Sequence, residues 1–238
     1  MSDLHSYFVA GPENLLPHHI SKSEKPEKAL IRIVSELAEN GLDVFQLRAK
    51  SMKDIDIIEL IKDIRSATFN TKMKICINDN VNVASKCKGL IDILHLGQTD
   101  MDPNEAKKLI DQNIQIGLSI TNENQLGNIP NCVNYLGVGP IFPTGSKSDA
   151  SEPMGSNTLK KIINKTNLPV VAIGGISIED VCDLFKIGVS GVAVISAILN
   201  ENNPTENFKK MKENPQISTK QLKNHPKLIK FDQKMFAN

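Results

Sequence analysis

The sequence of 238 residues lacks the segments that would direct it into or across a membrane. No apolar run approaches the ~18 residues that a membrane helix needs. The first residues, from Met1 to His5, lack the basic segment and following apolar stretch of a signal peptide. We therefore expect a cytoplasmic protein without a membrane partner.

Cysteine is scarce, and its spacing excludes common metal sites. The four cysteines form no CxxC pair and have no histidine nearby at ligand spacing. A zinc site is therefore not expected, and reduced thiols are the default for such a set. The residues are Cys76, Cys87, Cys132 and Cys182.

The chain also lacks a strong excess of charge, since its net charge is +1. From residue 201 onward there are eight Lys against three Glu and one Asp. This basic tail has neither dense Arg nor the interleaved aromatic residues of a nucleic-acid arm, so no nucleic-acid partner is expected. We expect a domain over residues 1–204 and a basic, solvated extension over 205–238 that can be partly disordered. The sequence leaves a homo-oligomer open.

What the sequence does contain is an alternation of short β-branched runs with longer amphipathic stretches, within a composition that is 40% hydrophobic. This alternation predicts a parallel sheet covered by helices. The expected strands are Tyr7–Val9, Val44–Leu47, Met73–Ile77, Ile91–Leu96, Ile114–Leu118, Tyr135–Val138, Val170–Ile173 and Gly191–Val194. The expected helices are Glu27–Asn40, Lys53–Ala67, Pro103–Asp111, Asn157–Lys165 and Ile178–Lys186, with two weaker ones near Val81–Lys86 and Asn122–Leu126.

Eight strands with eight crossovers favour a single-domain α/β fold, the (β/α)₈ TIM barrel, over an open doubly wound sheet. The first strand is followed by no GxGxxG, and no acidic residue ends a second strand to bind a ribose, which argues against the open sheet. In a barrel, the chemistry lies at the carboxyl ends of the strands. The residues that follow each strand are therefore the candidates for the site.

The second strand places Gln46, Arg48 and Lys50 on one side by alternation. Two cations and an amide suit a multiply charged oxyanion such as pyrophosphate, although a solvated basic turn remains an alternative. Asp79 and Asp100 follow the third and fourth strands. Two carboxylates on adjacent loops suit Mg²⁺, although Asp79 could instead cap the next helix.

Two further residues near these strands have other expected roles. Asp102 is expected to cap a helix that starts at Pro103. His95 lies inside an apolar run and is expected in the barrel interior.

The last four strands predict a phosphate site. The loops after strands seven and eight carry Gly174-Gly175 and Ser196, a combination typical of the phosphate site of barrels. Ser119 ends the fifth strand and can donate a hydrogen bond to a phosphate oxygen. The sixth strand leads into a loop with Thr144, Ser146 and Lys147, two hydroxyls and a third cation.

These motifs together resemble the thiamine phosphate synthase family over roughly residues 8–199. The motifs that carry the resemblance are QLRAK, CINDN, HLGQTD, GLS, YLGVGPIFPTGSK, VVAIGGI and GVAVISAI, in the order of the family. The resemblance implies an aminopyrimidine pyrophosphate site, a Mg²⁺ site and a thiazole phosphate site. The implied residues are Gln46, Arg48, Lys50, Asn78, Ser119 and Lys147 for the first, Asp79 and Asp100 for the second, and Thr144, Ser146, Gly175, Ile195 and Ser196 for the third, with Gly174 as the adjacent turn residue.

The sequence departs from the family in three places. Ala49 stands where the family usually has Glu between the Arg and the Lys, at a position expected to face away from the ligand. The hydroxyl pair is Thr144 and Ser146 rather than two threonines, and the first strand ends in Val-Ala-Gly-Pro rather than the common Thr-Asp.

The implied reaction is the Mg²⁺-assisted, dissociative joining of a pyrimidine pyrophosphate to a thiazole phosphate. The charge of the leaving pyrophosphate would be neutralised by Arg48, Lys50 and Lys147. Ser119 is counted with them among the catalytic residues. The thiazole nitrogen carries no proton, so no general base is needed. Two alternatives remain: a thiazole tautomerase, which would need a His in the loop after strand five, and a non-catalytic barrel that binds a phosphorylated ligand.

Overall fold

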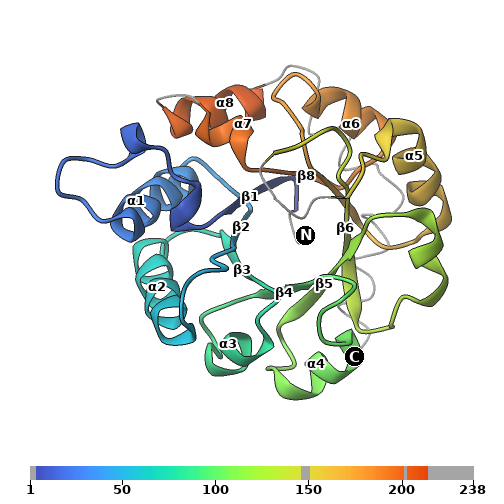
Figure 1. The fold of residues 1–238 in the computed structure, drawn as a ribbon, viewed down its shortest axis with the longest axis horizontal. Coiled ribbons are helices and arrows are strands. Elements are labelled where there is room, and N and C mark those ends of the chain that lie inside the picture. The colour runs from blue at the N-terminus through green and yellow to red at the C-terminus, as the bar shows by residue number, and fades with distance from the viewer. Residues whose placement is uncertain (1–3, 146–150, 201–202, 214–238) are drawn as a thin grey trace.

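Eight parallel strands pair in chain order and close into a barrel, with β8 returning to β1. The computed structural model describes residues 4–145, 151–200 and 203–213. Figure 1 looks down the ring of strands, and the helices surround it in chain order. The strands are β1 Ser6–Ala10, β2 Val44–Leu47, β3 Lys74–Asn78, β4 Ile93–Leu96, β5 Gln115–Ile120, β6 Val133–Val138, β7 Val170–Ile173 and β8 Gly191–Val194. This confirms the predicted TIM barrel.

The helices follow the expected pattern with small shifts at their ends. The α-helices are α1 Pro26–Glu39, α2 Asp54–Ala67, α3 Val81–Lys86, α4 Pro103–Leu109, α5 Gly155–Lys165, α6 Val181–Ile187, α7 Ser196–Leu199 and α8 Pro204–Glu213. Three short 3₁₀ helices are η1 Pro12–Asn14, η2 Pro17–His19 and η3 Glu123–Asn128. The weak helical signal after the fifth strand thus corresponds to η3 rather than to an α-helix.

Strand alternation divides the core into two layers. Residues such as Phe8 and Phe45 point outward and pack against the helices in one large apolar cluster. Tyr7, Val44 and Val171 point inward and belong to a smaller cluster that fills the barrel. The interior is therefore a packed core, as expected for this fold.

Helix α8 completes the ring of helices by packing between α7 and α1 (Figure 1). Its Phe208 is fully buried, and the Asn207 amide donates to the Ile198 carbonyl oxygen at 3.0 Å. Lys212 donates to the carbonyl oxygens of Asn40 and Gly41, beyond the last residue of α1, at 3.0 and 3.2 Å. Residues 205–213, the part of the expected extension that the structure describes, therefore pack against the barrel.

None of the helices in the described ranges is both long enough and apolar enough to cross a bilayer.

Candidate active site

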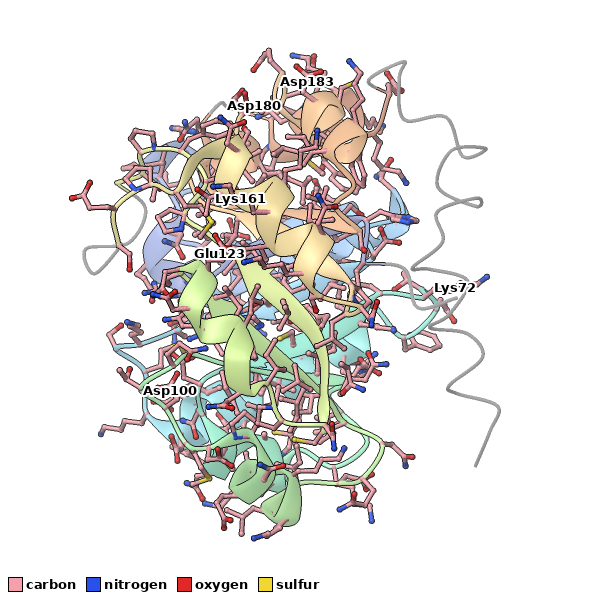
Figure 2. The ribbon with its side chains drawn as sticks, turned by 90° about the vertical axis from the view of Figure 1, so that its right-hand side faces the viewer. Lys72, Asp100, Glu123, Lys161, Asp180 and Asp183 are labelled. Carbon is pink, nitrogen blue, oxygen red and sulfur yellow. The ribbon has the colours of Figure 1, made fainter. Side chains whose placement is uncertain are left out.

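The described residues that were predicted to carry chemistry follow the strands at their carboxyl ends, which the parallel order brings to one end of the barrel. In the side view of Figure 2, Asp100, which follows β4, lies at the end opposite to Lys72, which precedes β3. Two hollows open among the loops at the carboxyl ends of the strands.

The first hollow, here called the glycine hollow, lies over β5 to β8. It brings together six of the predicted site residues from four different strand ends. They are Ser119, Thr144, Gly174, Gly175, Ile195 and Ser196. The hollow is also lined by Thr121, Pro140 and Ser151, which the sequence did not single out. Pro140 lies within the motif after the sixth strand, but a motif does not show which of its residues face the hollow.

Gly174 and Gly175 are required by both conformation and space. Both have positive φ, +97° and +66°, where a side chain would strain the backbone. A Cβ on Gly175 would lie 2.4 Å from the Pro143 carbonyl oxygen and 2.6 Å from that of Phe142. The loop after β6 is also tied to this turn, since the Phe142 N–H donates to the Gly174 carbonyl oxygen at 3.0 Å. The glycine hollow is therefore shaped by backbone held in close contact.

The second hollow, here called the carboxylate hollow, lies at the ends of β2 and β3. Its polar lining includes Lys50, Asn78 and Asp79. The Glu13 carboxylate in η1 accepts the backbone N–H of Lys50 at 3.3 Å, and the Arg48 N–H donates to the Ala10 carbonyl oxygen at 3.0 Å. The loop after β1 thus contacts the backbone at the end of the QLRAK motif.

Ala49 is buried in the outer apolar layer. It also lines the carboxylate hollow, so its expected orientation away from the ligand stays a prediction.

Asp79 adopts an unusual backbone conformation at the end of β3. Its φ is +61°, in the left-handed region, and its N–H donates to the His95 carbonyl oxygen on β4 at 2.8 Å. The cap of α3 is Asn80, whose side chain accepts the Val83 N–H at 2.9 Å. Asp79 is therefore not the helix cap that its position also allowed, and its carboxylate accepts the Asn78 side-chain amide.

Of the other two acidic residues of this region, Asp102 has the role expected from sequence, and the role of Asp100 stays a prediction. The Asp100 carboxylate is exposed and accepts the Gly97 N–H at 2.7 Å. Asp102 caps α4, accepting the N–H groups of Asn104 and Glu105. Within the described ranges, no three His, Cys, Asp or Glu side chains cluster closely enough to hold a metal ion by themselves.

Gln46 points into the barrel and contacts residues that the sequence did not single out. Its Oε1 accepts the Tyr7 hydroxyl at 2.8 Å, and its Nε2 donates to Asn78 Oδ1 at 2.6 Å. The Tyr7 and Tyr135 hydroxyls lie 2.9 Å apart, and Tyr135 contacts His95. His95 thus lies in the barrel interior, as expected.

Burial is the main cause that raises the pKa of both phenols well above the ordinary value, so both keep their protons near neutral pH. The third buried acid here, the Cys76 thiol, has its pKa raised to about 12 by burial.

Two predicted residues of the loop after β6, Ser146 and Lys147, lie outside the described residues. Their proposed roles remain predictions from sequence.

Comparison with known proteins gives a consistent family match. The model of a family described as thiamine monophosphate synthase matches residues 18–198. A thiamine-phosphate synthase of Lactococcus lactis subsp. lactis is 34% identical over 216 residues, covering 89% of this chain and 96% of that protein. One from Clostridium botulinum (strain Kyoto / Type A2) is 36% identical over 179 residues, covering 74% and 85%.

Solved structures agree with these matches. A thiamine phosphate pyrophosphorylase from Pyrococcus furiosus is similar with a TM-score of 0.75 and 28% identity, over 89% of this chain and 95% of that one. A 3-hexulose-6-phosphate synthase, 12% identical with a TM-score of 0.61, shares the fold alone.

Proposed function

Because the chain belongs to the thiamine phosphate synthase family and is an enzyme of thiamine phosphate synthesis, we propose its substrates and the roles of its residues. It condenses 4-amino-2-methyl-5-hydroxymethylpyrimidine pyrophosphate with thiazole phosphate, giving thiamine phosphate and pyrophosphate. The observation that carries this proposal is the pairing of two unlike hollows at one mouth of the barrel. Two phosphorylated substrates need two anion sites that face a common centre.

The carboxylate hollow suits the pyrimidine pyrophosphate. Lys50 and Asn78 line it, and Arg48 and Gln46 come from the same strand end. Arg and Lys stabilise the charge that grows on the leaving pyrophosphate as its C–O bond breaks. Lys147 is proposed as the third cation.

The glycine hollow suits the thiazole phosphate. Backbone at Gly175 and Ile195 and the hydroxyls of Thr144 and Ser196 provide neutral donors for a phosphate, and Ser146 is proposed to join them. This arrangement holds the nucleophile by its phosphate and leaves its ring nitrogen to face the pyrimidine. Fixing two reactants in this way can lower a barrier by ~7–11 kcal/mol.

The acidic residues fit a Mg²⁺ ion. Asp79 and Asp100 follow adjacent strands, and the exposure of Asp100 leaves access for water. In proteins, Mg²⁺ is usually held by one or two carboxylates, and substrate oxygens and water complete its coordination. When bound, the ion would supply additional neutralisation of the pyrophosphate charge.

The reaction needs no base from the protein, since the thiazole nitrogen has no proton to lose. A tautomerase would need such a group in the loop after β5. Glu123 is the acid in that loop, and its carboxylate is paired with Lys165, which lowers its pKa. The proposal also includes a cytoplasmic location, favoured by cysteines that are all free thiols.

A coupling assay with both substrates, with and without Mg²⁺, tests the function. We expect thiamine phosphate to form only with Mg²⁺. Asp79→Ala and Asp100→Ala should each lower kcat by about 100- to 1000-fold, in line with the loss of one strong electrostatic contact at a transition state. Asp102→Ala is the matched control, because its carboxylate only caps α4.

Full activity in both carboxylate variants would refute the metal assignment. Tight binding of both substrates without any product would instead favour a non-catalytic binding protein.

A further inference from the structure

The turn that joins β8 to α7 carries two residues of the glycine hollow, Ile195 and Ser196. On one side this turn is fixed by β8, which pairs with β7 and with β1. On the other side it leads into α7, a single helical turn of four residues. A helix this short is not stable by itself in water, since few of its backbone groups find partners within it. The position of Ser196 therefore depends on what holds α7 in place.

The hydrogen bonds of α7 are local. The Ile198 and Leu199 N–H groups donate to the Ile195 carbonyl oxygen, each at 3.2 Å, and the Asn200 N–H donates to the Ser196 carbonyl oxygen at 2.7 Å. Among the residues that the structure describes, no side chain caps the start of this helix. These bonds shape the turn, but they do not attach it to the rest of the barrel.

Helix α8 supplies a polar contact that does attach it. Asn207 of α8 is only 2% exposed, and its Nδ2 donates to the Ile198 carbonyl oxygen at 3.0 Å. Because α7 ends at Leu199, this carbonyl oxygen belongs to the last turn and has no donor within its own helix. The Asn207 amide therefore binds a group that α7 itself leaves open.

Asn207 stands where an apolar residue would be expected. The buried residues of α8 are Pro204, Asn207, Phe208 and Met211, spaced as on the buried face of an amphipathic helix. The other three are apolar. Burying an amide costs free energy that its hydrogen bonds must offset, and an apolar side chain would avoid this cost. Packing alone would be served as well by leucine, so the amide matters for its contact with α7.

Asn207 also lies directly behind the glycine hollow. A third hollow, here called the outer hollow, is lined by Asn207 together with Thr144, Gly175 and Ser196. The last three residues also line the glycine hollow, so they form a wall that both hollows share. Asn207 is not part of the lining of the glycine hollow itself. It can therefore act on a ligand there through Ser196 rather than by direct contact.

The rest of α8 is attached to α1, the 14-residue helix on its other side. The Thr205 hydroxyl donates to the Glu36 carboxylate at 2.9 Å, and Lys212 donates to the Asn40 carbonyl oxygen at 3.0 Å. In Figure 1, α8 lies between α7 and α1 and packs against both. Helix α8 thus connects the turn after β8 to a long helix of the outer ring, which gives Asn207 a fixed position.

We propose that Asn207 is a positioning residue for thiazole phosphate: by holding α7, it sets the place of the Ser196 hydroxyl and the Ile195 backbone against the phosphate. This inference rests on the proposed function, which places that phosphate in the glycine hollow. The family model matches residues 18–198, so Asn207 lies beyond the match. All the residues that the family resemblance implies for the phosphate come before α8.

Steady-state kinetics of Asn207→Leu test the proposal, because this change removes the amide and keeps a side chain of similar size. We expect KM for thiazole phosphate to rise about tenfold, the upper value of one net hydrogen bond, because the turn is no longer held against the phosphate. Both kcat and KM for the pyrimidine pyrophosphate should stay within about twofold, since the phosphate is bound alike before and during the reaction. A partly unfolded enzyme would instead show a lower kcat and unchanged KM values.

Thr205→Val is the matched control, because it removes a hydrogen bond from α8 to α1 and none to α7. It should leave KM for thiazole phosphate within about twofold. Asn207→Ala adds no atoms and takes the place of Asn207→Leu if the leucine prevents folding. An unchanged KM for thiazole phosphate in a folded Asn207 variant, or an equal rise in Thr205→Val, would overturn the proposal.

Amide hydrogen exchange of the full chain tests the same contact without a substrate. The N–H groups of Leu199 and Asn200 close the turn of α7. They should exchange about tenfold faster in Asn207→Leu than in the unaltered protein, because one net hydrogen bond no longer opposes the opening of the turn. In Thr205→Val their exchange should not change. Equal protection of these groups in Asn207→Leu would show that the amide does not hold α7.

Titration with inorganic phosphate separates this inference from the proposed function. The NMR signal of the Ser196 backbone N–H should shift on binding, and Asn207→Leu should weaken that binding about tenfold. If this is found but the two substrates give no thiamine phosphate, the proposed function fails while the positioning role stands. If coupling proceeds but phosphate leaves the Ser196 signal in place, or binds Asn207→Leu equally well, the positioning role fails alone.

Discussion

The glycine hollow and the carboxylate hollow share one mouth of the barrel but are built by different means. The first is shaped by backbone, with Gly175 packed against the loop after β6 at distances that no side chain could occupy. The second is lined by side chains such as Lys50 and Asp79, anchored by a carboxylate from the loop after β1. A backbone-built site should be sensitive to added atoms, and a charge-built site to lost charge.

The largest expected effect on KM comes from adding one methyl group to the glycine hollow. Gly175→Ala forces a positive φ on a side chain and a contact with two carbonyl oxygens, which should displace the loop after β6. We expect KM for thiazole phosphate to rise about 100-fold, as for a displacement of about 1 Å. The free energy of unfolding should fall by about 1–3 kcal/mol.

Gly127→Ala is the control for that change, because a Cβ there would have nothing within 4 Å. Steady-state kinetics and thermal unfolding measure both effects. If Gly175→Ala left KM for thiazole phosphate unchanged, the glycine hollow would not be the thiazole phosphate site.

The next effect comes from removing charge from the other hollow. Lys50→Met keeps the length of the side chain and loses its cation, so KM for the pyrimidine pyrophosphate should rise about 10- to 100-fold, the value of a charge-assisted hydrogen bond. KM for thiazole phosphate should stay within about twofold. Lys53→Met, three residues on at an exposed position before α2, is the matched control.

An equal effect of Lys50→Met on both substrates would show that the two hollows are not separate sites. The comparison on which the proposal depends would then fail.

The barrel itself followed from sequence because its signal is repeated eight times. The strands Val170–Ile173 and Gly191–Val194 have the bounds predicted from their β-branched pattern, and α3 spans Val81–Lys86 as its weak signal suggested. The segment after β5 differs because it is short and polar. Asn122 caps it through the Asn124 N–H, and such local hydrogen bonds favour a 3₁₀ turn over a longer α-helix.

The candidate site was only partly predictable. Strand alternation indicates which way a side chain points, but it does not indicate which residues that side chain contacts. Alternation placed Gln46 and Leu47 on opposite sides of β2, and the GG pair indicated a turn, both of which the structure bears out. Tyr7 and Tyr135, the only tyrosines of the chain, were missed because each starts an apolar run and resembles a core residue. Their scarcity was the available signal, but the hydroxyl contact joins residues 128 positions apart.

The smallest effect should come from removing one hydroxyl of the glycine hollow. This change tests whether the glycine hollow binds phosphate through its backbone rather than through side chains. Ser196 lies at the start of α7 and lines the hollow beside Ile195 and Gly175. If backbone N–H groups carry most of the phosphate binding, Ser196→Ala should raise KM for thiazole phosphate only about 3- to 10-fold, the value of one net hydrogen bond.

Ser177→Ala is the control, because that hydroxyl donates to Asp180 at 2.8 Å. Titration of both variants with thiazole phosphate measures the effect. A loss in Ser196→Ala as large as that of Gly175→Ala would mean that the hydroxyl, not the backbone, dominates phosphate binding. The glycine hollow would then work by the same means as the carboxylate hollow, since both would depend on side chains.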